Sequence, residues 1–374
     1  MASGVAYAQH RLRAGIALAH SRLNLKMEER MARVELKSLP VDLVGGERYE
    51  VRHWEVTARA PGPCVLITAA LHGNEVQGSE VLRRVLPLLR RGLRKGVCLL
   101  VPMANPCAIQ RHWPHIDFEH GRTYSGDRVN NVNCTWPGDA GGSNAQCLSH
   151  ALFQTLVERA THSIDIHCWS CVTAAAALAV TGDRASIELA GVSGLRFARH
   201  MQWLPKEPLK PDSPRILTGH FAATGRPAVA VELSGQYGFW PREVAWGVRA
   251  VKNWLRHVGM LSGEPEVPDG GPIWLNDNPG TDVPSPRAGL FVPQPSYATS
   301  VWVEAGRALG HVFAADDLST TVVQAPVSGY LYQLRPAHEK TSEHTMMWLH
   351  PHVKDGEVLA KICAPSAPVA SGAK

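Results

Sequence analysis

The sequence lacks any apolar stretch approaching the roughly 20 residues that a membrane-spanning helix requires. It also lacks a large excess of one charge, since the formal net charge is only +5 over 374 residues. A mild positive charge permits attraction to anionic substrates but does not indicate a nucleic-acid partner. We therefore expect neither a membrane nor a nucleic acid among the partners. The 45% hydrophobic content predicts a globular fold with a substantial core.

The cysteines do not form the pattern of a disulfide-rich protein. Eight are scattered through the chain, and no secretory signal is recognisable. We therefore expect reduced thiols in a cytoplasmic protein. The apolar run 14–19 is short for a signal core and has no clear cleavage site after it. Met27 or Met31 is an alternative start, which would make residues 1–30 a flexible N-terminal extension.

Strand-like and helix-like stretches alternate between residues 31 and 261. Strands are predicted at residues 33–39, 48–56, 64–71, 96–106, 163–169 and 227–235. Helices are predicted at residues 75–93, 149–160 and 241–261. This alternation predicts an α/β domain over residues 31–261, with a mixed, mostly parallel sheet flanked by helices. Such sheets place their sites at the carboxyl ends of strands.

The composition changes near residue 262. A segment rich in Pro, Gly and Asp leads into short alternating strands, which predict a small β module over residues 262–363. Residues 364–374 are expected to be a disordered tail. The stretch PVSGYLYQL resembles biotinyl and lipoyl hairpins but lacks the attachment lysine, which excludes a carrier role. The module is expected to narrow access to a site on the larger domain or to support an oligomer.

A histidine and a carboxylate follow the strand 64–71 directly. His72 and Glu75 form H-x-x-E, a weak pattern in a chain with 18 histidines. One explanation is an acidic residue favoured at a helix N-terminus. The strand-to-helix turn favours a metal site instead, because residues three apart there face the same side. Gly73 would allow the backbone to turn tightly between them.

A third metal ligand is available on another strand. Catalytic zinc typically takes three protein ligands and leaves one position for water. His167 lies near the end of the strand SIDIHCW, and Asp165 is placed to orient a ligand from the same face. The alternative is a buried histidine satisfied by backbone groups. Cys168 and Cys171 form a single C-x-x-C, which we interpret as structural thiols because no second pair exists.

Glu232 ends the apolar strand AVAVEL. A carboxylate after five apolar residues is costly unless it is used or paired. One glutamate beside a metal can take a proton from water and deliver it to a leaving amine. The alternative is an ion pair with one of the arginines.

Five motifs appear in a recognisable order: strand–H-G-N-E–helix, strand–N-P, N-x-N-x-x-W-P-G, D-I-H and V-E-L-x-G. Over about residues 40–260 the chain resembles the succinylglutamate desuccinylase/aspartoacylase family, the zinc deacylase branch of the carboxypeptidase A-like fold. The C-terminal module resembles the β-barrel that follows in many members, through GLFVP, VWVEAGRALGHV and APVSGYL. The resemblance therefore implies a zinc carboxypeptidase-like domain followed by a small β-barrel-like module.

The resemblance also implies a mechanism. One zinc ion per subunit would lie on His72, Glu75 and His167, with Glu232 as the general acid/base. The reaction would be hydrolysis of an amide that frees an amine and a carboxylate. Asn105 is expected among the substrate-binding residues.

The substrate-binding loop departs from the family pattern. Asn133 matches the substrate-binding asparagine, but Cys134 stands where an arginine normally clamps a substrate carboxylate. Cysteine cannot form that bidentate contact. Either the substrate lacks the usual α-carboxylate, or Arg128 or another arginine replaces the clamp. A second arginine, which polarises the scissile carbonyl, would fall on Arg122 or on Arg111, and Arg122 fits the spacing better.

Three functions follow from these residues. The leading hypothesis is a zinc-dependent amidohydrolase that cleaves a small N-acyl amine or amino-acid derivative. The second is a metallocarboxypeptidase that trims small peptides, against which the missing arginine at position 134 counts. The third is a non-enzymatic binding protein on a decayed scaffold, against which the intact metal and base positions count. The partner expected in each enzymatic case is a small-molecule amide or peptide, and a homo-oligomer is left open.

Overall fold

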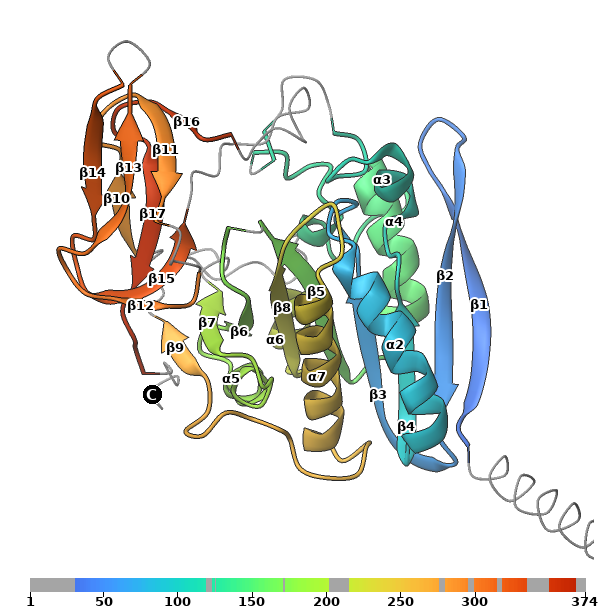
Figure 1. Ribbon diagram of the computed structural model, residues 1–374. Helices are drawn as coiled ribbons and strands as arrows, with labels where there is room; N and C mark the ends of the chain where they lie inside the picture. Colours follow the sequence, from blue (N-terminus) through green and yellow to red (C-terminus); the bar gives the residue numbers. More distant parts are fainter. Residues whose placement is uncertain are drawn as a thin grey trace, which may run out of the picture.

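The computed structural model describes most of the chain between residues 31 and 367 (Figure 1). The described ranges are 31–118, 123–124, 126–170, 172–201, 215–275, 280–294, 299–314, 318–334 and 350–367. The expected N-terminal extension, residues 1–30, lies outside them. No helix in these ranges is both long and apolar enough to cross a membrane.

A mixed sheet forms the centre of the larger domain. Its strands are β1 Arg33–Asp42, β2 Arg48–Thr57, β3 Ala60–Ala69, β4 Lys95–Val101, β5 His162–Trp169, β6 Ala176–Val180, β7 Phe197–Met201, β8 Ala228–Ser234 and β9 Ile273–Leu275. They lie in the order β1-β2-β4-β3-β5-β8-β6-β7-β9. The four strands β4, β3, β5 and β8 are parallel to one another, and so are β6, β7 and β9. The pairings of β1 with β2, β2 with β4 and β6 with β8 are antiparallel.

Helices cover both faces of this sheet (Figure 1). They are α2 Gln77–Gly92, α3 Pro106–Arg111, α4 Asn144–Leu152, α5 Arg184–Gly191, α6 Leu217–Ala223 and α7 Pro241–His257. Side chains of α2, α5 and α7 share one hydrophobic core with the sheet, and those of α3, α4 and α6 share a second. In helix α2 the buried Val81, Val85 and Leu89 recur at the spacing of one helical face, which is the apolar pattern that predicts a helix from the sequence. The predicted mixed α/β sheet flanked by helices is confirmed.

The C-terminal module consists of two antiparallel sheets. One contains β10 Thr281–Pro284, β17 Val358–Cys363, β15 Gly329–Leu334 and β12 Trp302–Val303. The other contains β14 Thr320–Gln324, β13 Ala308–Phe313, β11 Gly289–Pro293 and β16 His352–Val353. Their inward-facing side chains form a common apolar core. The all-β character of the module is confirmed, whereas its barrel-like closure stays a prediction.

The boundary between the two parts differs from the predicted one. Strand β9 lies within the range assigned to the module, yet it pairs with β7 and extends the large sheet. The expected tail also begins later than residue 364, because Pro365 bridges to Leu275 and the Ser366 amide donates to the Trp274 carbonyl. Free backbone groups at the sheet edge explain both differences, since an edge strand pairs with any suitable segment.

Strand β15 connects the module to the larger domain. The amide of Ala174 donates to the Tyr332 carbonyl at 2.9 Å, and the amide of Leu334 donates to the Val172 carbonyl at 3.1 Å. The Tyr332 ring meets the Trp169 ring edge-on, with centroids 5.5 Å apart. The module therefore holds the segment that follows β5, which is one side of the site described next.

Candidate metal centre

The predicted ligands come together at the carboxyl ends of neighbouring strands. His72 and Glu75 lie in the turn between β3 and α2, and His167 lies on β5. Glu232 lies on β8 directly opposite His167 in the parallel register. The topology that places β3, β5 and β8 side by side is thus what assembles residues separated by 160 positions in the chain.

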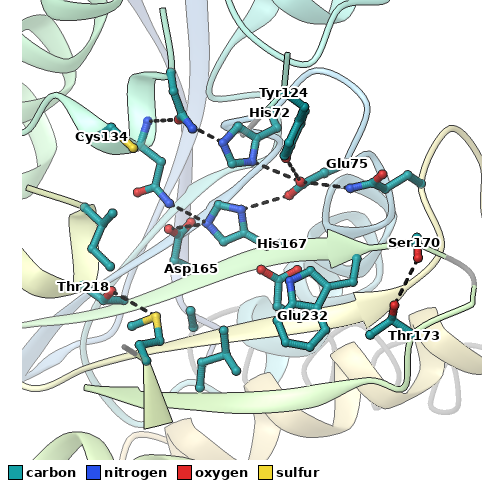
Figure 2. A pocket seen from close by; sticks show the side chains of 18 residues that line it. His72, Glu75, Tyr124, Cys134, Asp165, His167, Ser170, Thr173, Thr218 and Glu232 are labelled. Carbon is teal, nitrogen blue, oxygen red and sulfur yellow. Dashed lines mark hydrogen bonds and ion pairs between the residues drawn. The ribbon is translucent and has the colours of Figure 1, made fainter. Parts of the chain in front are cut away.

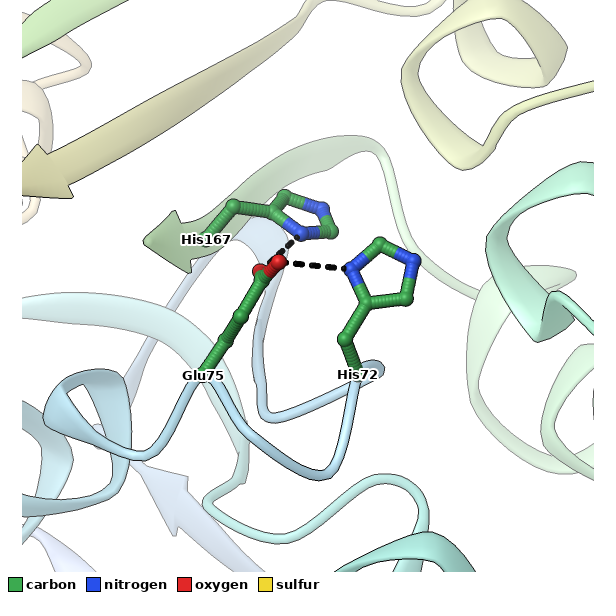
Figure 3. A group of neighbouring side chains, drawn as sticks. All are labelled: His72, Glu75 and His167. Carbon is green, nitrogen blue, oxygen red and sulfur yellow. Dashed lines mark hydrogen bonds and ion pairs between the residues drawn. The ribbon is translucent and has the colours of Figure 1, made fainter. Parts of the chain in front are cut away.

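The two histidines and Glu75 surround one point (Figure 3). One ligand atom from each of the three lies within 4.8 Å of the other two. His72 Nδ1 is 3.1 Å from Glu75 Oε1, and His167 Nδ1 is 2.9 Å from Glu75 Oε2. All three side chains are buried, with residue exposures of 7%, 3% and 4% for His72, Glu75 and His167. Two imidazole nitrogens and a carboxylate form a donor set that zinc prefers.

Acceptor groups hold the far side of each ring. His167 Nε2 is 2.7 Å from Asp165 Oδ2, and His72 Nε2 is 3.0 Å from Asn131 Oδ1. An oxygen acceptor at Nε2 favours a hydrogen there, which leaves the lone pair of each ring on Nδ1, toward Glu75. Buried His72 Nδ1 has no hydrogen-bond partner in the described part of the chain. In this orientation both Nδ1 atoms and the Glu75 carboxylate are placed to bind one cation between them.

The electrostatics of the site indicate the same need. Burial alone would raise the pKa of Glu75, but the charge of His72 and the contact with His167 outweigh it and lower that pKa well below its ordinary value. Burial would lower the pKa of His167, but Asp165 and Glu75 outweigh it and raise that pKa well above its ordinary value. The surroundings therefore stabilise negative charge on Glu75 and positive charge beside it, as a divalent cation requires.

Glu232 is held in a different electrostatic state. Burial, with a further contribution from the charge of Glu75, raises the pKa of Glu232 well above its ordinary value. Its Oε2 atom is enclosed without a hydrogen-bond partner, and no arginine forms an ion pair with it within the described ranges. The predicted alternative of a structural ion pair is thus unsupported among these residues. A carboxyl group with a raised pKa next to a metal-type site suits proton transfer.

The turn that carries His72 and Glu75 is shaped by close backbone approach. A Cβ atom on Gly73 would lie 2.4 Å from the Ala108 carbonyl carbon and 2.4 Å from the Trp113 carbonyl oxygen. Gly73 does not adopt a positive φ, so its role differs from the conformational freedom expected from the sequence. The Gly73 amide donates to the Pro114 carbonyl at 3.0 Å, which fixes the turn against the segment after α3.

A cavity of about 310 Å³ opens beside these residues (Figure 2). Asn133 and Cys134 line it together with the predicted ligands and Glu232. The Asn133 side chain is positioned by the Leu217 amide, which donates to its Oδ1 at 3.0 Å, and its Nδ2 lies 3.3 Å from His167 Nε2. The volume is at the lower end of the range for small-molecule sites, about 300–1,000 Å³.

The other predicted substrate-binding residues lie elsewhere. Arg111 is not among the residues lining the cavity and pairs with Glu47 at 2.7 Å and Asp117 at 3.2 Å. Asn105 is buried and caps α3, with its side chain bonded to the Ala108 amide and the Leu71 carbonyl. These contacts account for both residues without a substrate.

Two further arginines, Arg128 and Arg122, were predicted at the substrate site. Arg128 is exposed and outside the cavity lining. Its charge acts on the Cys134 thiol, where it opposes the raising of the pKa by burial. Arg122 lies outside the described residues, so its predicted role remains a prediction.

Three residues of the site were not anticipated. The Tyr124 hydroxyl donates to Glu75 Oε1 at 2.8 Å, and Gln236 Nε2 donates to the same oxygen at 3.2 Å. Asn131 contacts His72 and also accepts a hydrogen bond from the Asn133 amide at 2.9 Å. The paired asparagines of N-x-N were a usable signal for Asn131. Tyr124 and Gln236 lie in irregular segments that carry no periodic signal.

The thiol interpretation of Cys168 is supported by its position. Cys168 lies in the core beneath α2 and α7, on the face opposite His167, as strand alternation requires. Burial raises the pKa of its thiol well above the ordinary value. Its predicted companion Cys171 lies outside the described residues.

Comparisons with known proteins agree with this fold. A family model for the succinylglutamate desuccinylase/aspartoacylase catalytic domain matches residues 61–258. Over 228 residues the chain is 29% identical to N-alpha-acetyl-L-2,4-diaminobutyric acid deacetylase from Halomonas elongata. That alignment covers 59% of this chain and 62% of the relative, which is less than two thirds of the relative's length.

Solved structures share the fold along almost their whole length. An aspartoacylase family protein from Mesorhizobium loti superimposes with a TM-score of 0.67 at 20% identity, covering 89% of this chain and 95% of that one. The product-bound ectoine utilization protein EutE (DoeB) from Ruegeria pomeroyi gives a TM-score of 0.66 at 18% identity, covering 90% and 97%. Because the family match spans more than half of the chain, the protein belongs to the succinylglutamate desuccinylase/aspartoacylase family.

Proposed function

We propose that this protein is a zinc-dependent amidohydrolase that cleaves the amide of a small N-acyl amine or amino-acid derivative. The observation that carries the proposal is the cluster of His72, Glu75 and His167 at one point, with the Glu232 carboxyl group beside it. Membership of a deacylase family supports it, as does the relative from Halomonas elongata, which is named as a deacetylase.

His72, Glu75 and His167 would hold one zinc ion per chain. Bound zinc supplies a Lewis acid for the substrate carbonyl and makes water more acidic. Asp165 and Asn131 orient the two imidazole rings, which keeps Nδ1 of each ring directed at the shared point. Tyr124 and Gln236 bind one oxygen of Glu75 and hold its carboxylate in place.

Glu232 is the proposed general base and acid. Its carboxylate takes a proton from the attacking water as the water oxygen bonds to the acyl carbon. The same proton then passes to the amide nitrogen while the C–N bond breaks, so the products are an amine and a carboxylic acid, which loses its remaining proton to solvent as a carboxylate. Burial and the neighbouring Glu75 raise the pKa of Glu232, which makes its carboxylate a stronger base toward water and suits it to hold the proton until the leaving nitrogen takes it.

Residues around the cavity would position the substrate. Asn133 is the proposed hydrogen-bonding partner, since its amide is fixed by Leu217 at the edge of the cavity. Arg122 is the proposed group that polarises the carbonyl. We propose further that the C-terminal sheets form a barrel-like module that supports the cavity wall, because Tyr332 packs against Trp169, which lines the cavity.

Assays of four proteins on a panel of N-acyl amines and blocked dipeptides test this function. Wild type is expected to hydrolyse N-acyl amines, and His72→Ala and Glu232→Gln are expected to lose activity by about 1,000-fold or more. His162→Ala is the matched control, because His162 lies at the opposite end of the strand that carries His167. Activity surviving in both site variants would rule out the mechanism, and a preference for blocked dipeptides would favour the metallocarboxypeptidase alternative.

A further inference from the structure

The cavity beside the metal-type site is lined by polar residues and by a cluster of apolar ones. This cluster consists of Leu178, Met201, Ile216 and Ala230, and we call it the apolar wall. Ala230 lies two residues before Glu232 on β8, so both side chains face the same side of the sheet. Leu178 pairs with Ala230 across β6 and β8. The apolar wall therefore begins directly beside the proposed catalytic carboxyl group.

The serine and threonine hydroxyl groups that line the cavity are engaged within the protein. Thr218 Oγ1 lies 4.0 Å from the sulfur of Met201, and the hydroxyls of Ser170 and Thr173 bond each other at 3.1 Å. A substrate group beside the apolar wall would contact methyl groups, methylenes and sulfur rather than polar groups that lack a hydrogen-bond partner. Apolar surfaces of this kind gain from covering by an apolar ligand.

A substrate carboxylate in the cavity would need a cation to pair with. None of its described lining residues is a lysine or an arginine, whereas Glu75, Asp165 and Glu232 are all among them. Cys134 occupies the position of the arginine expected from the family pattern. Burial raises the pKa of its thiol, although Arg128 and His167 act in the opposite direction, so the thiol is neutral near pH 7. An anionic substituent would lie near these carboxylates and would find no lysine or arginine to pair with among the described lining residues.

We propose that the amine half of the substrate is neutral and apolar and carries no carboxylate, as in an N-acyl alkylamine. This inference rests on the amidohydrolase function proposed above and assigns its substrate class. Cys134 and the apolar wall are the specificity-determining features. A carboxylate placed here would lose its hydration without gaining a cation, whereas an alkyl group would be removed from water against Leu178 and Ala230.

Arg128 is a competing source of positive charge for a substrate carboxylate, since the proposed function assigns Arg122 to the acyl carbonyl. It is exposed and does not line the cavity, yet its charge reaches the Cys134 thiol. If Arg128 replaced the missing clamp, the enzyme would prefer substrates that bear a carboxylate, and this preference would disappear in Arg128→Gln. The two possibilities therefore predict opposite preferences for the same compounds.

Three compounds with one side chain separate these cases: N-(3-methylbutyl)acetamide, N-acetyl-leucinamide and N-acetyl-leucine. Only the third carries a carboxylate. With zinc-loaded, full-length protein we expect kcat/KM for the first two to exceed that for N-acetyl-leucine by about 100-fold or more, as rejection of an unpaired buried charge requires. A higher kcat/KM for N-acetyl-leucine would overturn the proposal.

Variants at position 134 test the cause of the preference. Cys134→Arg restores a cation and is expected to shift the ratio toward N-acetyl-leucine by about tenfold or more. Cys134→Ser stays neutral and small, and it should retain the preference for the neutral compounds. Arg128→Gln should retain it too. A preference that does not change in Cys134→Arg would contradict the assigned role of this position.

Binding measurements distinguish failure of this inference from failure of the proposed function. Absence of turnover for every compound, with zinc bound, would count against the amidohydrolase function itself. Calorimetry with zinc-loaded Glu232→Gln then measures the binding affinity of the same three compounds without turnover. Tighter binding of the two neutral compounds supports the inference, and either equal binding or no binding of any compound overturns it.

Discussion

Asp165 Oδ2 lies 2.7 Å from Nε2 of His167, two residues further along the same strand. The second oxygen of Asp165 accepts a hydrogen bond from the Thr68 hydroxyl at 2.6 Å, on the neighbouring strand β3. Both groups are buried. The Thr68 hydroxyl on the neighbouring strand thus positions the Asp165 carboxylate, and this carboxylate orients the His167 ring so that Nδ1 is directed at Glu75.

Asp165→Asn should weaken zinc binding by about 10- to 100-fold, because a ligand histidine loses the partner that orients it and raises its basicity. Competition with a chromogenic chelator measures the affinity. Asp183→Asn is the matched control, since Asp183 caps α5 away from the site and asparagine caps equally well. Unchanged zinc affinity in Asp165→Asn would show that the contact does not support the metal.

Gly73→Ala should displace the turn that carries His72 and Glu75. Its methyl group would lie 2.4 Å from backbone atoms of residues 108 and 113, and such overpacking costs about 1–3 kcal/mol of stability. Urea unfolding and zinc affinity should both be impaired. Gly191→Ala has nothing within 4 Å of the new methyl group and should be neutral or stabilising. Normal zinc binding in Gly73→Ala would argue against a tightly packed turn.

Tyr332→Leu should remove packing that supports the cavity wall, although Tyr332 is not in direct contact with the predicted metal ligands. Tyr332 packs against Trp169, and the Arg199 guanidinium lies 4.6 Å from the Tyr332 ring centroid. We expect KM to rise about tenfold or more, since small displacements of positioning groups have effects of this size. Tyr330→Leu on the same strand is the control, because Tyr330 packs on Phe197 and Trp302 instead. Equal KM values for the two variants would rule out a specific supporting role for Tyr332.

Glu55 should stabilise the fold in a pH-dependent way. Hydrogen bonding from Arg159, against the effect of burial and with help from Lys37, lowers the pKa of Glu55 to about 2 from 4.5. A lowered folded-state pKa gives stability that is present above the unfolded pKa and is lost as the pH falls through the folded one. We expect Glu55→Gln to cost about 1–2 kcal/mol at pH 7, after a reduction for the exposure of Arg159. The measurement is urea unfolding between pH 7 and pH 3.

The difference between wild type and Glu55→Gln should be constant above about pH 5 and shrink steadily below pH 4.5. Glu266→Gln is a suitable control because its carboxylate is exposed and pairs only on the surface. A difference that stays constant down to pH 3 would contradict the lowered pKa of Glu55.

The strands with long apolar runs were predictable, and so were the residues at their ends. The second half of β3 and most of β5 and β8 are buried, and polar residues lie at or directly after the carboxyl end of each strand. That pattern led to His72, His167 and Glu232 independently of any geometry. Asp165 followed from strand alternation alone.

Other parts of the fold depend on contacts that local sequence does not reveal. Strand β6 has the sequence AALAV, and alanine favours helices in isolation. It is extended because β8 and β7 pair with it on either side. Asn131 and Tyr124 lie in irregular segments, where only the folded chain shows which side chains reach His72 and Glu75.

The most direct test of the account is a zinc titration of metal-free wild-type protein, followed by the rate of hydrolysis of an N-acyl amine. The account predicts no activity without metal, a linear rise with added zinc, and a plateau at one zinc per chain. Full activity in protein shown to be metal-free, or no dependence of the rate on zinc, would contradict it.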